Sequence, residues 1–253
     1  MLVETSSWTL TMIRRIANKT RRKIFEGLGL SRYSRPSINN IDKQLAKYIS
    51  YRNGFFIEVG ANNGFSQSNT YYLERFLNWS GVLIEPIPEL YDQCVKERKK
   101  AKVFNCALVD KNYKETHITM TYANLMSITN GAFENQERAK AHVEKGCNLQ
   151  KVSSYEIQVP AKTLTSILDK LSLDKIDFFS LDVEGFELNV LNGLDFDKYC
   201  PRYLLIETSF RDDVDQLLSK WYIQVDQFSH HDFFYKHKES SSTLKPQQVS
   251  SLI

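Results

Sequence analysis

The sequence predicts an α/β fold with a doubly wound, mostly parallel sheet of seven strands. Short apolar runs bounded by glycine, proline or acidic residues alternate with segments whose apolar residues recur at helical spacing. That alternation is typical of parallel strands joined by helical crossovers. The last two apolar runs, 221–228 and 232–237, are separated by a short turn, which predicts an antiparallel hairpin at one edge.

Each element follows from a local pattern. The first helix, 42–50, has Ile41, Leu45, Tyr48 and Ile49 on one face. The second strand ends at Pro86, because proline has no N–H group to continue the hydrogen bonds between strands. The strands are expected at 54–60, 81–86, 102–108, 176–182, 202–208, 221–228 and 232–237. The helices are expected at 42–50, 66–77, 88–100, 164–171, 186–191 and 212–220.

The region between the third and fourth strands is less regular. Alternating runs at 116–120 and 155–160 predict two more strands, and the polar stretch between them predicts an insertion at about 121–150. Helical pieces are expected around 133–145. The chain would therefore divide into a basic arm with a helical extension (1–53), a main domain (54–237) and a disordered tail (238–253).

Charge is unevenly distributed along the chain. Residues 1–40 hold eight basic and two acidic side chains, a net +6, which leaves −3 for the remainder of a chain whose net charge is +3. Trp8, Met12 and Ile16 recur at helical spacing, so this segment predicts a basic amphipathic helix. It is either a packing arm with solvated basic side chains or a peripheral contact with a membrane or polyanion.

Composition excludes several classes of protein. With 42% hydrophobic and 25% charged residues, the chain resembles an ordinary globular protein, and no apolar run approaches the ~18 residues of a membrane span. The N-terminus lacks the order of a signal peptide. The four cysteines are scattered without metal-ligand spacing, which indicates reduced thiols and a cytoplasmic location. Nucleic acid is not expected, because the main domain is slightly acidic and contains no recognisable binding module.

The segment "EVGANNG" (58–64) follows the first strand, where doubly wound sheets bind ligands. Gly60 and Gly64 allow positive φ and close approach of a ligand to bare backbone. The spacing is not GxGxxG, and the next helix opens with hydroxyl and amide side chains. A dinucleotide, and with it a nicotinamide-dependent oxidoreductase, is therefore disfavoured.

Two acids end the first two strands. Glu85 lies 85 − 64 = 21 residues beyond Gly64, a distance at which an acid typically accepts the hydroxyls of an adenosine ribose. Glu58 stands beside the glycine loop and suits an ammonium group better than a phosphate. A nucleoside joined to a cationic amino acid describes S-adenosylmethionine. The alternative is that both are ordinary strand-end acids in solvent.

A third group of acids lies in "SLDVEGFELNVLNGL" (180–194). Glu187, and partly Glu184, are explained by the favourable position of negative charge at a helix start. Asp182 has no such explanation and is expected to point into the crevice. Asp182 and Glu207 could share Mg²⁺, although no third oxygen ligand is evident. His231, with its neighbour His230, is an alternative base or a solvated turn residue.

The segments "FFIEVGANNGFSQSNTYYLE", "GVLIEPIPELY", "CALVD" and "IDFFSLDVEGFELNVLNGLDF" resemble the FkbM family of S-adenosylmethionine-dependent methyltransferases over roughly residues 54–236. This resemblance implies a class I methyltransferase (Rossmann-like) fold of seven strands and, in general, O-methylation of sugars or polyketide-type products. The family often has Asp where Glu58 stands.

The resemblance also implies site residues. Asp182 and Glu184 would border the reaction centre; His231 is a further candidate base because of its place near the same rim, not because of the resemblance. The cofactor would be held by Glu58, Gly60, Ala61, Asn62, Asn63, Gly64, Asn69, Glu85, Pro86, Cys106 and Ala107. No metal ligand is assigned. The expected activity is methyl transfer to a hydroxyl of a sugar, glycan or small natural product, and the rival is a catalytically silent interaction module on the same scaffold.

Overall fold

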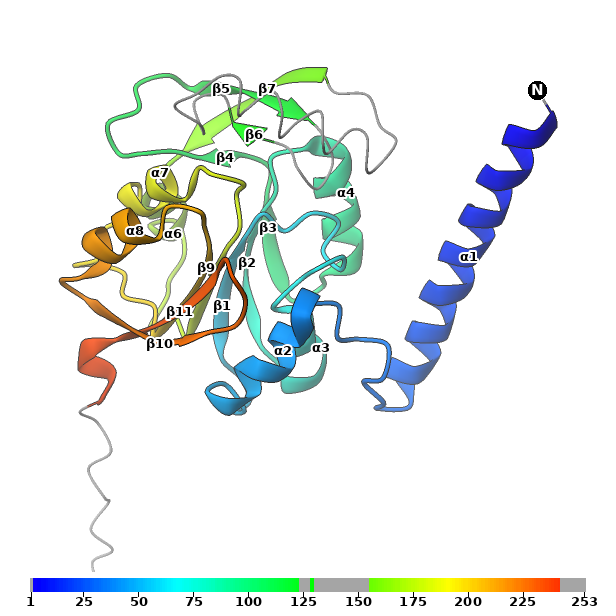
Figure 1. Ribbon diagram of the computed structural model, residues 1–253, viewed down its shortest axis with the longest axis horizontal. Coiled ribbons are helices and arrows are strands. Elements are labelled where there is room, and N and C mark those ends of the chain that lie inside the picture. Colours follow the sequence, from blue (N-terminus) through cyan, green and yellow to red (C-terminus); the bar gives the residue numbers. More distant parts are fainter. Residues whose placement is uncertain (1, 123–127, 130–154, 242–253) are drawn as a thin grey trace, which may run out of the picture.

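The computed structural model describes residues 2–122, 128–129 and 155–241. Its main sheet has seven strands in the order β10-β11-β9-β8-β1-β2-β3 (Figure 1). The strands are β1 (Phe55–Val59), β2 (Ser80–Ile84), β3 (Ala101–Phe104), β8 (Phe178–Leu181), β9 (Tyr203–Glu207), β10 (Tyr222–Gln227) and β11 (Asp232–His237). All neighbours pair in parallel except β11, which is antiparallel to both β9 and β10. The doubly wound sheet and its antiparallel edge hairpin are thus confirmed.

Apolar side chains on both faces of the sheet hold the helices. Successive residues of one strand serve opposite layers, as the pleat requires: Phe56 packs in one buried cluster and Ile57 in the other. The Phe56 layer includes residues of α2 (Ile41–Gln44), α3 (Tyr71–Leu77) and α4 (Pro88–Glu97). The Ile57 layer includes residues of α6 (Leu164–Leu168), α7 (Glu187–Asn192) and α8 (Arg211–Leu218). The result is a three-layer sandwich.

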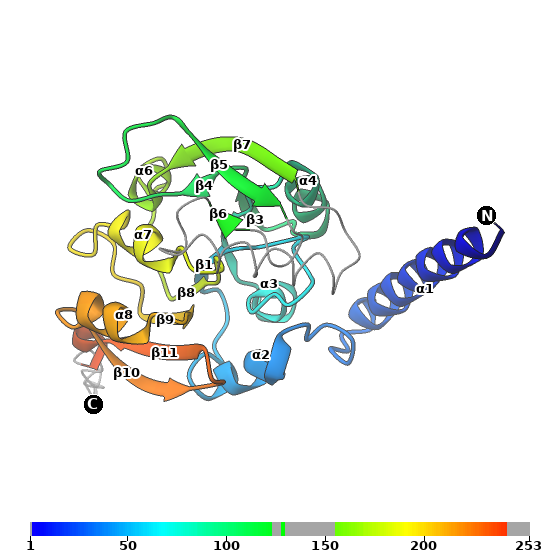
Figure 2. The same ribbon diagram turned by 45° about the horizontal axis from the view of Figure 1, so that its top comes forward.

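A second, four-stranded sheet lies over the carboxyl end of the main sheet (Figures 1 and 2). Its order is β4-β7-β5-β6, with β4 (Ala107–Leu108), β5 (His117–Tyr122), β6 (Ile128–Thr129) and β7 (Tyr155–Lys162). The strand expected at 102–108 is therefore divided between two sheets. The break falls at Asn105, whose side-chain amide donates to the carbonyl oxygens of Glu85 and Pro86 and ends β3. The helical pieces expected around 133–145 lie outside the described residues.

Two helices differ from the sequence prediction. The helix expected at 66–77 begins only at Tyr71, because Gln67 has a left-handed backbone (φ 62°) and the preceding residues turn toward Glu58. The helix expected at 42–50 is divided into α2 and a 3₁₀ turn, η2 (Leu45–Lys47). Its predicted apolar face is nevertheless buried, since Leu45 and Ile49 are almost inaccessible to solvent.

The N-terminal extension forms α1 (Leu2–Gly27), which stands apart from the sheets in both views (Figures 1 and 2). A 3₁₀ turn, η1 (Ile38–Asn40), leads into α2, and η4 (Lys238–Ser241) follows β11. The rest of the predicted tail lies outside the described residues. Within the described part of the chain, no helix is both long and apolar enough to span a bilayer. Cys94, Cys106 and Cys200 are free thiols there.

Candidate active site

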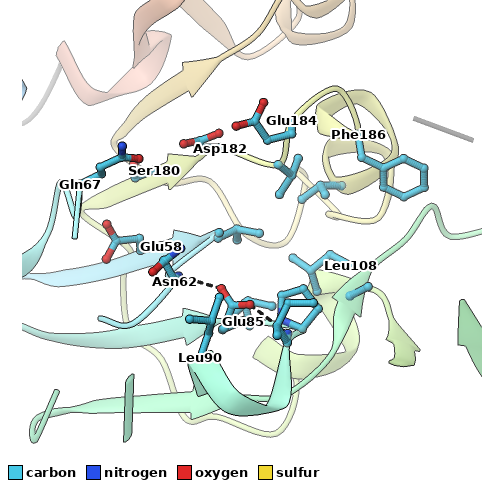
Figure 3. A pocket seen from close by; sticks show the side chains of 18 of the residues that line it. Glu58, Asn62, Gln67, Glu85, Leu90, Leu108, Ser180, Asp182, Glu184 and Phe186 are labelled. Atoms are coloured by element: carbon cyan, nitrogen blue, oxygen red, sulfur yellow. Dashed lines mark hydrogen bonds between the residues drawn. The ribbon is translucent and has the colours of Figure 1, made fainter. Parts of the chain in front are cut away.

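A pocket lies beyond the carboxyl ends of β1, β2 and β8 and holds about 920 Å³ of space, part of it open to solvent (Figure 3). This is the position at which ligands bind in doubly wound sheets. Ten of the residues predicted from sequence line it: Glu58, Gly60, Asn62, Asn69, Glu85, Pro86, Cys106, Ala107, Asp182 and Glu184. The structure thus brings together acids from three strand ends.

Gly60 is required by the approach of two strand ends. It has φ of +84°, and a Cβ built on it would lie 1.9 Å from the carbonyl oxygen of Asp182. No side chain fits at that distance. Gly60 therefore lets the loop after β1 touch the loop after β8, so that both contribute to one pocket wall.

Gly64 has a different role from the one predicted. A Cβ there would lie 2.9 Å from Cγ of Arg98 and 3.1 Å from Cα of Cys94, and φ is +78°. The residue does not line the pocket. Its missing side chain lets the loop pack against α4 and Arg98 rather than admitting a ligand directly.

Ala61 and Asn63 also support the loop without lining the pocket. Ala61 is buried in the apolar layer under the loop. The Oδ1 atom of Asn63 accepts hydrogen bonds from the backbone N–H groups of Phe65 (3.0 Å) and Ser66 (2.8 Å). Together these two residues fix the turn whose other side chains face the pocket.

Glu58 is buried, and both of its carboxylate oxygens already have protein partners. Oε2 accepts hydrogen bonds from the hydroxyls of Ser68 (2.9 Å) and Thr70 (2.6 Å), and Oε1 accepts one from the backbone N–H of Asn69 (2.8 Å). The guanidinium of Arg98 adds an ion pair at 3.1 Å. The acid at the end of β1 therefore holds the segment 66–70 in place, which favours a positioning role over direct contact with an ammonium group.

Arg98 joins this network to the rest of the fold. Its guanidinium is inaccessible to solvent and donates to Glu74 (2.8 Å), Thr70 (2.7 Å) and the carbonyl oxygen of Gly64 (3.3 Å), in addition to Glu58. One arginine thus links α3, the loop after β1 and the end of β1. No sequence pattern indicates this role, because Arg98 lies in a run of basic residues that is typical of a solvated surface.

Glu85 is the buried acid at the end of β2. Its oxygens accept the backbone N–H groups of Asn62 (2.7 Å) and Ile87 (2.9 Å), the bonds drawn in Figure 3. Burial raises the pKa of Glu85 to about 8, and these two hydrogen bonds oppose the rise only partly. Each oxygen has a further acceptor site, so the carboxyl group still has capacity for a ligand hydroxyl.

Asn69 has an unsatisfied polar atom. Its amide nitrogen donates to the hydroxyl of Ser180 (3.1 Å), while its buried Oδ1 has no hydrogen-bond partner in the structure. A buried acceptor without a donor costs about 1–3 kcal/mol, so a ligand donor at this position would be stabilising. Asn69 lines the pocket on the Glu58 side.

Asp182 and Glu184 lie on the β8 side of the pocket, across from Glu85 (Figure 3). Burial, reinforced by the negative charge of Glu207 and then of Glu184, raises the pKa of Asp182 well above its usual range. Burial also raises the pKa of Glu207 to about 7, and its side chain shares a hydrogen bond with Asp182. Because the two carboxyl groups interact directly, the protonation of one depends on that of the other. Glu184 has a left-handed backbone (φ 52°), which is rare for this residue type.

Two further expectations concern this rim. His231 is exposed in the turn before β11 and does not line the pocket; its carbonyl oxygen accepts the backbone N–H of Thr208 (2.9 Å). The structure thus gives no support to His231 as a base in this pocket. Among the described residues, no group of three or more acidic, cysteine or histidine side chains is arranged to hold a metal ion.

Sequence reasoning missed part of the lining. The missed residues are Val59, Ser66, Gln67, Ser68, Ile84, Ile87, Leu90, Leu108, Met120, Ser180, Val183, Phe186 and Val190. Met120 comes from the second sheet, whose position over the pocket has no signal in the sequence. The hydroxyl and amide residues of "SQSN" (66–69) did carry a signal, because a helix rarely opens with four such side chains.

The seven-stranded sheet, with its acid-lined pocket at the strand ends, defines a Rossmann-like domain of the methyltransferase type. A sequence model described as "Methyltransferase FkbM domain" matches residues 58–238. The chain therefore belongs to the FkbM methyltransferase family. No curated protein matches it.

Solved structures give only weak similarity. An FkbM methyltransferase from Methylobacillus flagellatus KT is 14% identical with a TM-score of 0.43, and the match covers 76% of this chain but only 46% of that one. A SAM-dependent methyltransferase from Aquifex aeolicus is 12% identical (TM-score 0.42; 81% of this chain, 92% of that). A TehB-like SAM-dependent methyltransferase from Corynebacterium glutamicum is 10% identical (TM-score 0.36; 87% and 96%). At these values the family assignment depends on the domain match.

Proposed function

We propose that this protein transfers a methyl group from S-adenosylmethionine to a hydroxyl of a sugar, glycan or small natural product. Glu85 accepts the ribose hydroxyls, and the wall formed by Pro86, Cys106 and Ala107 contacts the adenine. Asn69 binds the ammonium group of the methionine end. Family membership supports methyl transfer, and the chemistry of the pocket supports this donor.

The observation that carries the proposal is the unpaired Oδ1 of Asn69. It supplies the acceptor that an ammonium group needs, next to a carboxylate (Glu58) that is held in place by Arg98. Glu85 lies on the other side of the pocket with remaining acceptor capacity. The donor set therefore fits a cationic amino acid at one end and a ribose at the other. Here Glu58 orients Asn69 through its backbone N–H, rather than binding the ammonium itself.

Proton removal is assigned to the acids on the β8 side. The bound cofactor supplies an electrophilic methyl group on a sulfonium sulfur, so the chain must align the acceptor hydroxyl and take its proton. A carboxylate whose pKa is raised toward neutrality is a stronger base than an ordinary one, and such a base contributes about 10²–10⁴-fold. Asp182, paired with Glu207 and next to Glu184, is our choice for this role.

Calorimetry tests the cofactor assignment. S-adenosylhomocysteine should bind and NAD should not. The Asn69→Ala variant should bind S-adenosylhomocysteine about 10-fold or more weakly, since a hydrogen bond to a charged group contributes about 1.5–3 kcal/mol. Asn112→Ala, an exposed amide change outside the pocket lining, is the control for loss of an amide. Tighter binding of NAD than of S-adenosylhomocysteine would refute the donor.

A methyl-donor assay against a panel of sugars and hydroxylated metabolites tests the reaction. Asp182→Asn should lower turnover by about 10²–10⁴-fold while leaving cofactor affinity within a few-fold. Asp174→Asn, an exposed change of the same kind, should have no effect. With wild type, kcat/KM should rise as pH rises through the neutral range, since burial raises the pKa of Glu207 to about 7 and raises that of Asp182 well above its usual range. Full activity of Asp182→Asn would remove Asp182 from the role of base. A chain that binds the cofactor but transfers no methyl group to any acceptor would favour the silent interaction module.

A further inference from the structure

In the part of the N-terminal helix α1 whose side chains the structure describes, the residues that contact the domain lie on one face. Lys19, Arg22 and Lys23 bind the carboxylate of Glu97 at 3.0, 2.7 and 2.9 Å. Glu26, on the same face, accepts hydrogen bonds from other parts of the chain and is buried. Residues at spacings of three, four and seven share one side of a helix, so these contacts define the side that faces the domain.

The adjoining side of α1 carries exposed apolar residues, and its edge lies on the same line of the helix as Lys19 and Lys23, since Met12 and Ile16 precede these lysines by seven residues. Met12, Ile13, Ile16 and Ile24 are 65%, 57%, 56% and 58% exposed, which is unusual for side chains of this size. Their spacing places them along one stripe. Figures 1 and 2 show α1 extending away from the sheets, so the described part of the chain does not cover this stripe.

The charges beside the stripe identify what would cover it. Arg14 and Arg15 are exposed and border its two edges, and no ion pair involves either of them among the residues described. From Thr5 to Phe25 the sequence contains six basic residues and no acid. A second copy of this helix would bring like charges together, which is unfavourable. The surface of an anionic membrane would bury the apolar stripe and pair the basic side chains at its edges with negative charge.

We propose that α1 binds the surface of a membrane that contains anionic lipids, with its apolar stripe inserted at the headgroup boundary and its basic edges on the lipid phosphates. This arrangement is that of an interfacial amphipathic helix, which lies in the plane of the membrane and does not cross it. The anchoring of Lys19, Arg22 and Lys23 on Glu97 then fixes the domain relative to the membrane. The proposal is independent of the methyl-transfer activity.

Vesicle sedimentation with the full chain tests it. The protein should bind phosphatidylcholine vesicles that contain phosphatidylserine, and added salt should release it. The variant Ile13→Gln/Ile16→Gln should bind at least about tenfold more weakly for each isoleucine, given the transfer free energy of a buried aliphatic side chain. The variant Arg14→Gln/Arg15→Gln should bind the vesicles about fivefold more weakly for each arginine that is replaced.

Ile223→Gln is the matched control, because Ile223 is 48% exposed on β10, far along the chain from α1. It should bind vesicles as wild type does. All of these positions are exposed, so thermal melting should be unchanged and a loss of binding is not a loss of folding. The proposal would be overturned if the wild-type protein did not bind the vesicles, or if the α1 variants bound them as tightly as wild type does. It would also be overturned if the wild-type protein were a dimer that Ile16→Gln dissociates.

Discussion

Removing the guanidinium of Arg98 is the sharpest test of the architecture under the pocket. Arg98→Met keeps most of the aliphatic volume but leaves the carboxylates of Glu58 and Glu74 without their buried positive partner. Breaking a buried ion pair by removing one partner costs about 3–5 kcal/mol. For a chain of this size each kcal/mol lowers Tm by about 2–4 °C, so the expected loss is about 6–20 °C.

Urea denaturation at neutral pH measures the loss directly. Adding Glu58→Gln and Glu74→Gln should recover part of the stability. Cofactor affinity should fall as well, since the segment 66–70 loses its support.

An exposed ion pair supplies the control. Lys220 binds Asp197 at 2.9 Å, and both side chains are well exposed, so Lys220→Met should cost at most about 1 kcal/mol. If Arg98→Met costs no more than Lys220→Met does, the buried network is not what holds the loop, and the positioning role of Glu58 fails with it.

Three further predictions concern single sites. Gly60→Ala places a methyl group against the carbonyl oxygen of Asp182 at a positive φ, so calorimetry should show S-adenosylhomocysteine binding lost; wild-type affinity would contradict this. Because the pKa of Glu85 is raised to about 8 in the folded protein, the free energy of unfolding of wild type should fall as pH rises from about 4.5 to 8. Urea titrations should show that the free energy of unfolding of Glu85→Gln depends less on pH; the same dependence as in wild type would contradict this. Burial would raise the pKa of Glu97, but hydrogen bonds from Lys23 and Lys19 and the Arg22 charge outweigh it and lower the pKa to about 2. The stability that Glu97 contributes should therefore be lost as pH falls from about 4.5 toward 2, and Glu97→Gln should speed hydrogen exchange in α1 at neutral pH; equal exchange would refute the anchor.

The main sheet was predictable because its strands are short, apolar and separated by helical patterns. Both faces of β1 are buried, so nearly every residue in it had to be apolar, and the acid at its end stood out. The edge hairpin followed from the shortness of the turn before β11. Local spacing carries this information, and the structure agrees with it.

What could not be predicted depends on contacts between distant segments. Glu58 is paired with Arg98, 40 residues later, whereas the sequence predicted the ammonium group of a ligand as its partner. Gly64 is small because α4 packs against it, not because a ligand does. The division at Asn105 reflects side-chain hydrogen bonds to the end of β2. Periodicity and spacing describe neighbours along the chain and contain none of these partners.

Glu97 and Arg98 are consecutive residues with different partners: Glu97 holds the N-terminal extension, and Arg98 holds the loop below the pocket. Recombinant protein trimmed before residue 28 would deprive Glu97 of three cations immediately beside the guanidinium that secures that loop. Activity measured on such a shortened chain would then reflect a disturbed pocket as well as the loss of α1. Affinity tags and deletions at this end should be judged by their effect on cofactor binding before any substrate is screened.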